Sequence, residues 1–211
     1  MKSYRFIQVG AHTGFTQEDW FLTGKINAND NCIFIEPVKE LFNKLVENYN
    51  KNFKNNNFIF LNKAISNYTG KLDLYTPDLE AINISSDLPH WADQLTSVLP
   101  EHVKDHSLNI PVKKITVECC TLHDVISEYE VESLDFLQID TEGHDKAVLE
   151  GLNLTYLKPK NVVFEKKHLD GTNYVNKFTG KNYHTAILKF LNAGYKKVYE
   201  NDLDIYFQLI E

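Results

Sequence analysis

The sequence YRFIQVGAHTG at residues 4–14 decides how the chain is expected to fold. Residues 4–9 form an apolar, β-prone run, and Gly10 and Gly14 bracket the turn that follows it. Because glycine has no Cβ, such a turn lets the backbone approach a ligand closely, although a plain tight turn would show the same two residues. The stretch predicts a first strand that ends in a candidate binding loop.

Working outward, short apolar runs alternate with segments of helical periodicity. The continuous run at residues 32–35 is typical of a buried parallel strand, and Pro37 suits the first position of a helix. Strands that alternate with helices favour a mostly parallel sheet covered on both faces, closed here by an antiparallel C-terminal hairpin. The expected strands are 4–9, 32–35, 58–61 (leading through 64–66), 71–75, 115–117, 134–139, 162–164, 195–199 and 205–209, and the expected helices lie near 17–24, 37–46, 121–128, 146–152 and 186–191.

Residues 77–112 differ from the rest of the chain. Four prolines interrupt a polar stretch that has isolated aromatic residues and no sustained period. Long irregular segments in compact domains are usually functional. We therefore expect a single domain over residues 1–211, which is long enough for one full core, with a lid-like insertion at about 77–112.

The composition excludes several classes of partner. The formal net charge is −7 and Arg5 is the only arginine, whereas nucleic-acid-binding proteins usually carry a basic surface with arginines for phosphate. No apolar run is long enough to span a membrane, and the first residues lack the features of a secretory signal. Three cysteines with no spaced framework suit a reducing compartment. We expect a cytoplasmic protein that binds neither nucleic acid nor membrane.

The residues that follow the strands indicate the ligand. In an open α/β sheet, ligands bind beyond the carboxyl ends of the strands, and Glu36 ends the second strand, where a carboxylate can accept hydrogen bonds from both hydroxyls of a ribose. This pattern favours a cofactor that contains adenosine. The turn lacks the Gly-x-Gly-x-x-Gly spacing that suits NAD and the Gly-Lys-Ser/Thr of a phosphate-binding loop. S-adenosylmethionine, which has a cationic sulfonium and no phosphate, suits the shorter turn and the acidic surroundings.

Five motifs in order resemble the FkbM family of class I methyltransferases, over nearly the whole chain. The segments are IQVGAHTG at 7–14, IFIEP at 33–37, AIS at 64–66, LDFLQIDTEGHD at 134–145 (followed by VLEG at 148–151), and VVFE at 162–165. The resemblance implies a Rossmann-like class I methyltransferase fold with a mostly parallel seven-stranded sheet, a C-terminal antiparallel hairpin and helices on both faces. It also implies S-adenosylmethionine as the cofactor, with S-adenosylhomocysteine as the product. The residues at the matching cofactor positions are Gln8, Gly10, Ala11, His12, Thr13, Gly14, Glu36, Pro37, Ala64, Ile65 and Asp140.

The resemblance further implies methylation of a hydroxyl oxygen of a sugar, a glycan or a small molecule. Methyl transfer from a sulfonium needs alignment of the reacting atoms and a base for the hydroxyl proton. We expect Asp140 to orient cofactor or substrate, and Glu142 to organise its loop, to cap the next helix or to accept a proton. His144 in the same loop and His168 after the next strand are the other candidate catalytic residues.

Several alternatives remain at this stage. His102 and His106 are four residues apart, but no third ligand is evident beside them, so a zinc site is not expected. A divalent metal held by Asp140, Glu142 and a histidine is conceivable but is not expected either. Gln8 stands where the family usually has an aspartate, which keeps open a catalytically silent binding or scaffold protein. An NAD-dependent sugar-modifying enzyme is the other alternative.

Overall fold

The structure is a computed structural model that describes residues 2–14, 26–54, 57–78, 80, 82, 88–89, 91–106, 108–170 and 180–210. The helix expected near 17–24 lies outside the described residues. No described helix is both long and apolar enough to cross a membrane.

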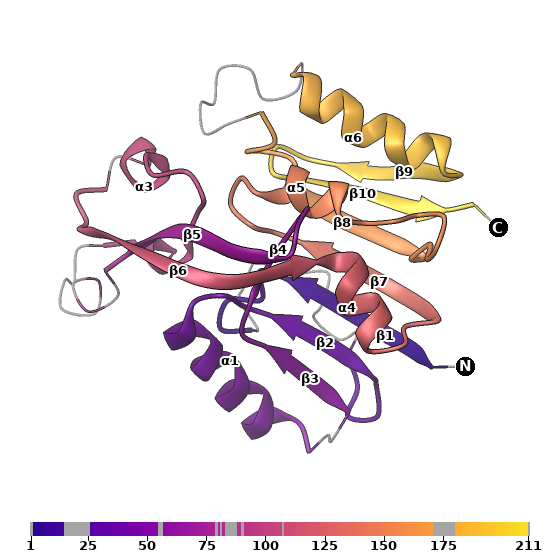
Figure 1. Ribbon diagram of the computed structural model, residues 1–211, viewed down its shortest axis with the longest axis horizontal. Helices are drawn as coiled ribbons and strands as arrows, with labels where there is room; N and C mark the ends of the chain where they lie inside the picture. Colours follow the sequence, from indigo (N-terminus) through magenta and orange to yellow (C-terminus); the bar gives the residue numbers. More distant parts are fainter. Residues whose placement is uncertain are drawn as a thin grey trace.

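A seven-stranded sheet forms the centre of the molecule, with the strand order β3-β2-β1-β7-β8-β10-β9 (Figure 1). Within this sheet, the neighbouring strands β3, β2, β1, β7 and β8 pair in parallel. By contrast, β10 pairs antiparallel with both β8 and β9. The mostly parallel sheet with a C-terminal antiparallel hairpin is therefore confirmed. The strands of this sheet are β1 (Ser3–Val9), β2 (Cys32–Ile35), β3 (Phe58–Leu61), β7 (Ser133–Ile139), β8 (Asn161–Glu165), β9 (Tyr195–Glu200) and β10 (Asp204–Leu209).

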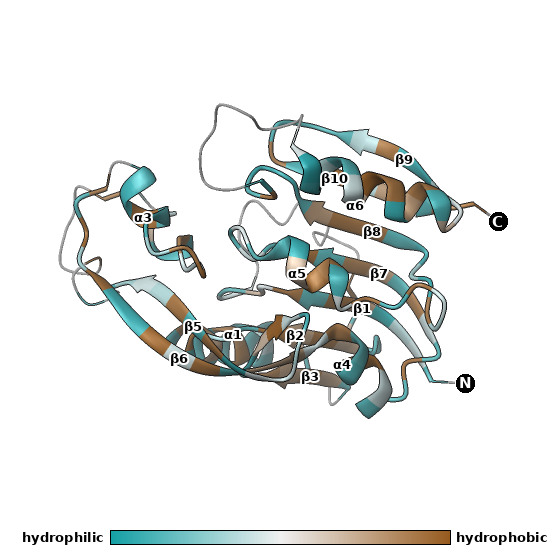
Figure 2. Ribbon diagram, turned by 45° about the horizontal axis from the view of Figure 1, so that its top comes forward, coloured by the Kyte–Doolittle hydropathy of each residue, from teal (hydrophilic) through white to brown (hydrophobic). Residues whose placement is uncertain are grey.

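Helices cover both faces of the sheet because successive side chains of each strand point in opposite directions. Ile7 and Ile33 pack in the cluster that contains the buried residues of α4 (Leu122–Glu128), α5 (Asp145–Glu150) and α6 (Lys181–Asn192). Their neighbours Phe6 and Phe34 face the other way and pack with Tyr49 of α1 (Lys39–Asn52). In Figure 2, α6 alternates between teal and brown, as expected for a helix with one buried face.

Two helix starts test the sequence predictions. Thr121, at the start of the helix expected near 121–128, caps α4 in a capping box with Asp124, which confirms this helix start. Pro37, expected to begin a helix, instead precedes α1, whose N-cap residue is Val38 in an extended conformation. The reason is local: the Glu36 side chain accepts a hydrogen bond from the Val38 amide at 2.8 Å, which holds these residues in a turn before the helix starts.

A second sheet of three strands has the order β4-β6-β5. It contains β4 (Ala64–Ser66), β5 (Gly70–Pro77) and β6 (Val112–Thr121), and in Figure 1 the β5–β6 pair extends away from the main sheet. The prediction that 64–66 continues the third strand is wrong, because these residues leave β3 and pair in parallel with Cys119–Thr121.

Among its described residues, the segment between β5 and β6 contains the short helices η1 (Ala92–Gln94) and α3 (His102–Asp105). Ala92, Leu95, Val103 and Ile110 form a small buried cluster of their own. The amide of Tyr75 donates to the Ser97 carbonyl at 2.8 Å, which ties the segment back to β5. The interpretation of this segment as a lid stays a prediction.

Candidate active site

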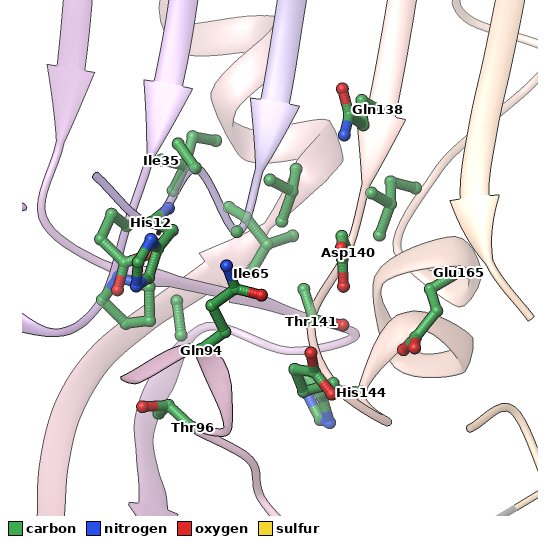
Figure 3. Close-up of a pocket in the computed structure, with 18 of the residues that line it drawn as sticks. His12, Ile35, Ile65, Gln94, Thr96, Gln138, Asp140, Thr141, His144 and Glu165 are labelled. Carbon is green, nitrogen blue, oxygen red and sulfur yellow. Dashed lines mark hydrogen bonds between the residues drawn. The ribbon is translucent and has the colours of Figure 1, made fainter. Parts of the chain in front are cut away.

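A cavity of about 440 Å³ lies at the carboxyl ends of β1, β2, β7 and β8, within the usual size range of small-molecule sites. The amides of Gly10 and Asp140 donate to the last carbonyls of neighbouring strands, Ile35 and Val9, and so bring the strand ends together. Figure 3 shows the arrowheads of the strands around the cavity, with His12 and Ile35 on one side and Glu165 on the other. This is the edge of the sheet at which the sequence predicted the ligand.

The turn after β1 needs a glycine at its first position. Gly10 has φ +80, and a Cβ there would overlap the carbonyl oxygen of Asp140 at the end of β7. The amides of Gly10 and Ala11 both donate to the carbonyl of Ile35, at 3.0 and 2.9 Å. The backbone of this turn is therefore held tightly between β2 and β7, and it forms one wall of the cavity.

Glu36 is a buried carboxylate at the end of β2. Its Oε2 accepts a hydrogen bond from the His12 amide at 2.9 Å and its Oε1 accepts one from the Val38 amide at 2.8 Å. The side chain is only 5% exposed yet lines the cavity. Burial raises the pKa of Glu36 to about 7, against the opposing effect of these hydrogen bonds. The group can thus ionise near neutral pH while it faces a ligand.

His12 connects this turn to the segment between β5 and β6. Its backbone has φ +49, which is unusual for a residue other than glycine, and such strain gathers at functional sites. Its Nε2 lies 3.5 Å from Oδ1 of Asp93, a residue of η1. The residues of this segment that line the cavity are Trp91, Gln94, Leu95, Thr96 and His106.

The loop after β7 also has a strained backbone. Residues of the segment between β5 and β6 hold it through polar contacts. Glu142 has φ +50, and its carbonyl accepts a hydrogen bond from the Ser97 hydroxyl at 2.6 Å. Its carboxylate lies 2.9 Å from Nε2 of His102. This geometry supports a role for Glu142 in organising the loop, which is one of the roles expected from the sequence.

His144, the N-cap residue of α5, is half-buried, and Asp145, the first residue of α5, is buried. Nε2 of His144 lies 3.0 Å from the hydroxyl of Ser66, and burial lowers the pKa of this histidine, so its neutral form is favoured at neutral pH. Asp145 accepts hydrogen bonds from the amide and hydroxyl of Thr141, and burial raises its pKa to about 7. His144 lines the cavity, whereas Asp145 supports the loop from behind.

The cavity brings together most of the residues predicted from the sequence. Those that line it are Gly10, Ala11, His12, Glu36, Pro37, Ala64, Ile65, Asp140, Glu142 and His144. Gln8, Thr13, Gly14 and His168 are not among the described residues that line it. Gln8 is buried within β1 in register with Gln138 of β7, and Gly14 packs against Tyr49.

Two groups of lining residues were missed by the sequence analysis. Gln94 and Thr96 come from the irregular segment, where no periodicity identified individual positions, and His106 of the same segment was considered only as a partner of His102. Leu203 comes from the turn of the C-terminal hairpin and Asp204 begins β10, and neither was singled out in the sequence. Asp204 pairs with Glu165 across β10 and β8, and this pairing brings the turn to the cavity.

His102 and His106 do have a third histidine beside them, contrary to the expectation from the sequence. One ring nitrogen from each of His102, His106 and His168 lies within 4.8 Å of the other two. His168 is 62 residues from His106 in the sequence and follows β8, so only the folded chain brings the three together. Glu165 lies beside His168 and is buried. Its burial, and to a lesser degree the charges of nearby carboxylates, raise its pKa well above the ordinary value.

The strand order and the C-terminal hairpin are those of the class I methyltransferase fold, and a ligand cavity lies at the carboxyl ends of the parallel strands. The family model described as Methyltransferase FkbM domain matches residues 8–197. The chain therefore belongs to the FkbM methyltransferase family, as the sequence motifs had suggested.

Comparison with solved structures gives two further similarities. Methyltransferase FkbM from Methylobacillus flagellatus KT is 13% identical with a TM-score of 0.56, and the match covers 97% of this chain and 43% of that one. The chain thus spans less than half the length of that relative. Magnesium protoporphyrin IX methyltransferase (ChlM) from Synechocystis PCC 6803, solved with bound SAM, is 6% identical with a TM-score of 0.45, covering 99% of this chain and 71% of that one. No curated protein matches the sequence.

Proposed function

We propose that the chain binds S-adenosylmethionine in this cavity and transfers its methyl group to a hydroxyl oxygen of a sugar, a glycan or a small molecule. The observation that carries the proposal is the Glu36 carboxylate, which lines the cavity and is held by the His12 amide. A carboxylate after the second strand of such a sheet accepts hydrogen bonds from the ribose hydroxyls of a bound nucleoside. Membership of the FkbM family makes S-adenosylmethionine the nucleoside that fits.

The surroundings of Glu36 also favour this cofactor over NAD. The turn at residues 10–14 has neither the third glycine nor the spacing that delivers a pyrophosphate to a helix N-terminus. Carboxyl groups at Glu36, Asp140 and Glu142 line the cavity, and such groups favour a cationic sulfonium over a phosphate. Ala64 and Ile65 offer an apolar surface for the adenine ring.

The transfer itself is an in-line displacement. The bond from the methyl carbon to sulfur breaks as the bond from that carbon to the acceptor oxygen forms, and the hydroxyl proton passes to a base. We propose His144 for that role, because its lowered pKa keeps it neutral and it lines the cavity. Asp140, exposed at the end of β7, then orients the acceptor or the methionine end of the cofactor.

The acceptor end of the cavity is formed by the segment between β5 and β6. Trp91 offers an aromatic face, and Gln94 and Thr96 add polar groups that can bond to hydroxyls. A sugar ring, which has apolar faces and a polar edge, matches this combination. We therefore propose residues 77–112 as a lid of the single domain 1–211 that closes over the acceptor.

The three cysteine thiols support a proposal about the cellular compartment in which the protein acts. Cys32, Cys119 and Cys120 are buried free cysteines. Protein thiols persist in the reduced form in the cytoplasm. We propose that the protein acts there.

The test of cofactor binding is calorimetric titration of S-adenosylhomocysteine into the wild-type protein, Glu36→Ala and the control Glu40→Ala. Glu40 lies on the exposed first turn of α1, so its removal keeps the cavity intact. We expect micromolar binding to the wild type and to Glu40→Ala, and a loss of at least about tenfold in Glu36→Ala, equivalent to about 1.4 kcal/mol. Circular dichroism of each variant checks that it is folded.

Two results would contradict the proposal. Heat from NAD and none from S-adenosylhomocysteine would favour the NAD-dependent alternative, and no heat from either with folded protein would favour the silent scaffold. The acceptor is sought with isotopically labelled S-adenosylmethionine and panels of glycans, small alcohols and RNA. Transfer of label to RNA alone would overturn the proposed acceptor class.

A further inference from the structure

Three imidazole rings meet at one wall of the cavity. His102 lies on α3 and His106 caps its C-terminus, while His168 follows β8. The ring centroids are 4.6 Å apart for His102 and His106, 4.7 Å for His102 and His168, and 5.9 Å for His106 and His168. Of the three, His106 lines the cavity, and His102 and His168 are 0% and 1% exposed.

Each ring has one nitrogen engaged by a hydrogen-bond acceptor. Nε2 of His102 lies 2.9 Å from the Glu142 carboxylate, and Nδ1 of His168 lies 2.9 Å from the Glu165 carboxylate. Nδ1 of His106 lies 2.8 Å from the carbonyl oxygen of His102. A backbone carbonyl can only accept, so Nδ1 of His106 carries a proton, and Nε2 of His102 and Nδ1 of His168 carry one when the carboxylates beside them are ionised. In neutral imidazoles the opposite nitrogens then present lone pairs.

This is the arrangement found around metal-binding histidines. Such histidines almost always donate their second ring N–H to a carboxylate or a backbone carbonyl, which fixes the tautomer and the orientation of the ring. Here two rings have a carboxylate and one has a carbonyl in that role. The partners of the protonated nitrogens are therefore those of metal ligands in all three cases.

The second ring nitrogen of His102 is an independent observation. His102 is fully buried, and among the described residues its Nδ1 has no hydrogen-bond partner. A buried polar atom without a partner costs about 1–3 kcal/mol, and such atoms in native structures call for an explanation such as a bound ion. Coordination of a cation by this lone pair would remove that cost.

We propose that His102, His106 and His168 bind a divalent transition-metal ion of the zinc class, with Glu142 and Glu165 orienting two of the rings. Imidazole ligands select zinc and its neighbours over magnesium and calcium, which prefer oxygen. Bonds of about 2.0–2.1 Å in a tetrahedral site separate the ligand nitrogens by about 3.3 Å. One ring nitrogen of each histidine already lies within 4.8 Å of the other two.

The ion would join parts of the chain that are distant in sequence. It would fasten α3, and with it the segment between β5 and β6, to the loop after β8 at the carboxyl edge of the main sheet. Three protein ligands leave a fourth tetrahedral position for water. The inference does not rest on the proposed methyl transfer, because the histidines and their acceptors define the site by themselves.

The test uses full-length protein without a polyhistidine tag, stripped of metal with a chelator and then dialysed. Zn²⁺ is titrated in by calorimetry, and Co²⁺ is followed by visible absorption, which reports tetrahedral coordination. His106→Ala is the informative variant, because His106 is only partly buried and the fold should tolerate its loss. His184→Ala, which removes an exposed histidine on α6, is the matched control.

We expect one Zn²⁺ per chain with micromolar or tighter affinity, a Co²⁺ spectrum of tetrahedral type, and a higher melting temperature with Zn²⁺. His184→Ala should behave like the wild type, whereas His106→Ala should bind at least about tenfold more weakly and lose the thermal shift. Absence of binding to folded wild-type protein would overturn the proposal. Equal binding by His106→Ala and the wild type would do the same, since the ion would then lie elsewhere.

Discussion

The carboxylate of Glu36 accepts the backbone N–H of His12 at 2.9 Å, and this hydrogen bond joins the end of β2 to the turn after β1. His12 has φ +49, a conformation that a residue with a side chain rarely adopts, and its ring also contacts Asp93 of η1. The Glu36–His12 bond thus helps to hold the turn in its strained shape. One buried group therefore supports the turn and faces the ligand cavity at the same time.

The first prediction concerns pH. The pKa of Glu36 is about 7, so about a tenth of the groups are ionised at about pH 6 and about nine tenths at about pH 8. Because ribose hydroxyls donate to the ionised form, affinity for S-adenosylhomocysteine should rise by about tenfold over this interval. Calorimetry at several pH values measures the change. Glu36→Gln should bind weakly with a flat profile, and an unchanged slope in this variant would assign the titration to another group such as Asp145.

The second prediction concerns Gly10. Alanine at φ +80 costs about 1–2 kcal/mol by itself, and its Cβ would also overlap the Asp140 carbonyl, so the ends of β1 and β7 must separate. Gly194→Ala is the control, because Gly194 has φ +94 but nothing within 4 Å of a Cβ. Both variants should lose stability in urea unfolding. Only Gly10→Ala should also lose S-adenosylhomocysteine binding by tenfold or more, and equal affinities in the two would contradict the importance of this close approach.

Much of this edge of the sheet could be predicted from the sequence, for physical reasons. Buried parallel strands require continuous apolar runs, which is why residues 32–35 were predicted with their observed bounds. Parallel strands also bring their carboxyl ends to one edge, so residues far apart in the sequence, such as Glu36 and Asp140, could be assigned to one cavity. The capping box at Thr121 depends on local chemistry alone and was equally predictable.

The other features of the fold and the site depend on side-chain contacts and strand pairings that no local sequence pattern encodes. The three-residue strand β4 is too short for periodicity to show which sheet it joins. Pro37 was misassigned because the Glu36 side chain, rather than the intrinsic preference of proline, decides where α1 begins. His168 meets His102 only when the segment between β5 and β6 folds back over the end of β8.

The third prediction concerns a partly buried ion pair, Lys166–Glu200, beside the site. Lys166 is 3% exposed, and its Nζ lies 2.7 Å from Oε1 of Glu200, which also accepts from the Tyr183 hydroxyl at 2.6 Å. Partial burial acts to raise the pKa of Glu200, but hydrogen bonds from Lys166, Lys197 and Tyr183 outweigh it and lower the pKa to about 2. Glu200→Gln should therefore cost about 2 kcal/mol at neutral pH, a value reduced from that of fully buried pairs because Glu200 is partly exposed.

The loss of stability caused by Glu200→Gln should depend on pH. Since the pKa of Glu200 is about 2 in the folded chain against an ordinary 4.5, its stabilisation is complete above about pH 4.5 and is lost as the pH falls toward 2. Urea unfolding of wild type and Glu200→Gln should therefore converge in acid. Glu47→Gln, which breaks an exposed pair with Lys51, is the control and should change stability little. A cost that is independent of pH would show that packing, and not charge, is responsible.

The last prediction concerns His144 and separates catalysis from binding. If His144 accepts the hydroxyl proton, His144→Asn should lower kcat by about 10²–10⁴ while S-adenosylhomocysteine affinity changes little. The rate is measured with the acceptor that the labelled-methyl screen identifies, and His184→Asn, on the exposed face of α6, is the control. Burial lowers the pKa of His144, so with S-adenosylmethionine saturating, which removes the effect of Glu36 on cofactor binding, kcat of the wild type should fall only below about pH 6.5 as the ring becomes protonated, and the variant should lack this step. A variant that keeps the acid limb and most of its kcat would remove His144 as the base and leave Glu142, the other residue of this loop predicted to accept a proton, as the group to test next.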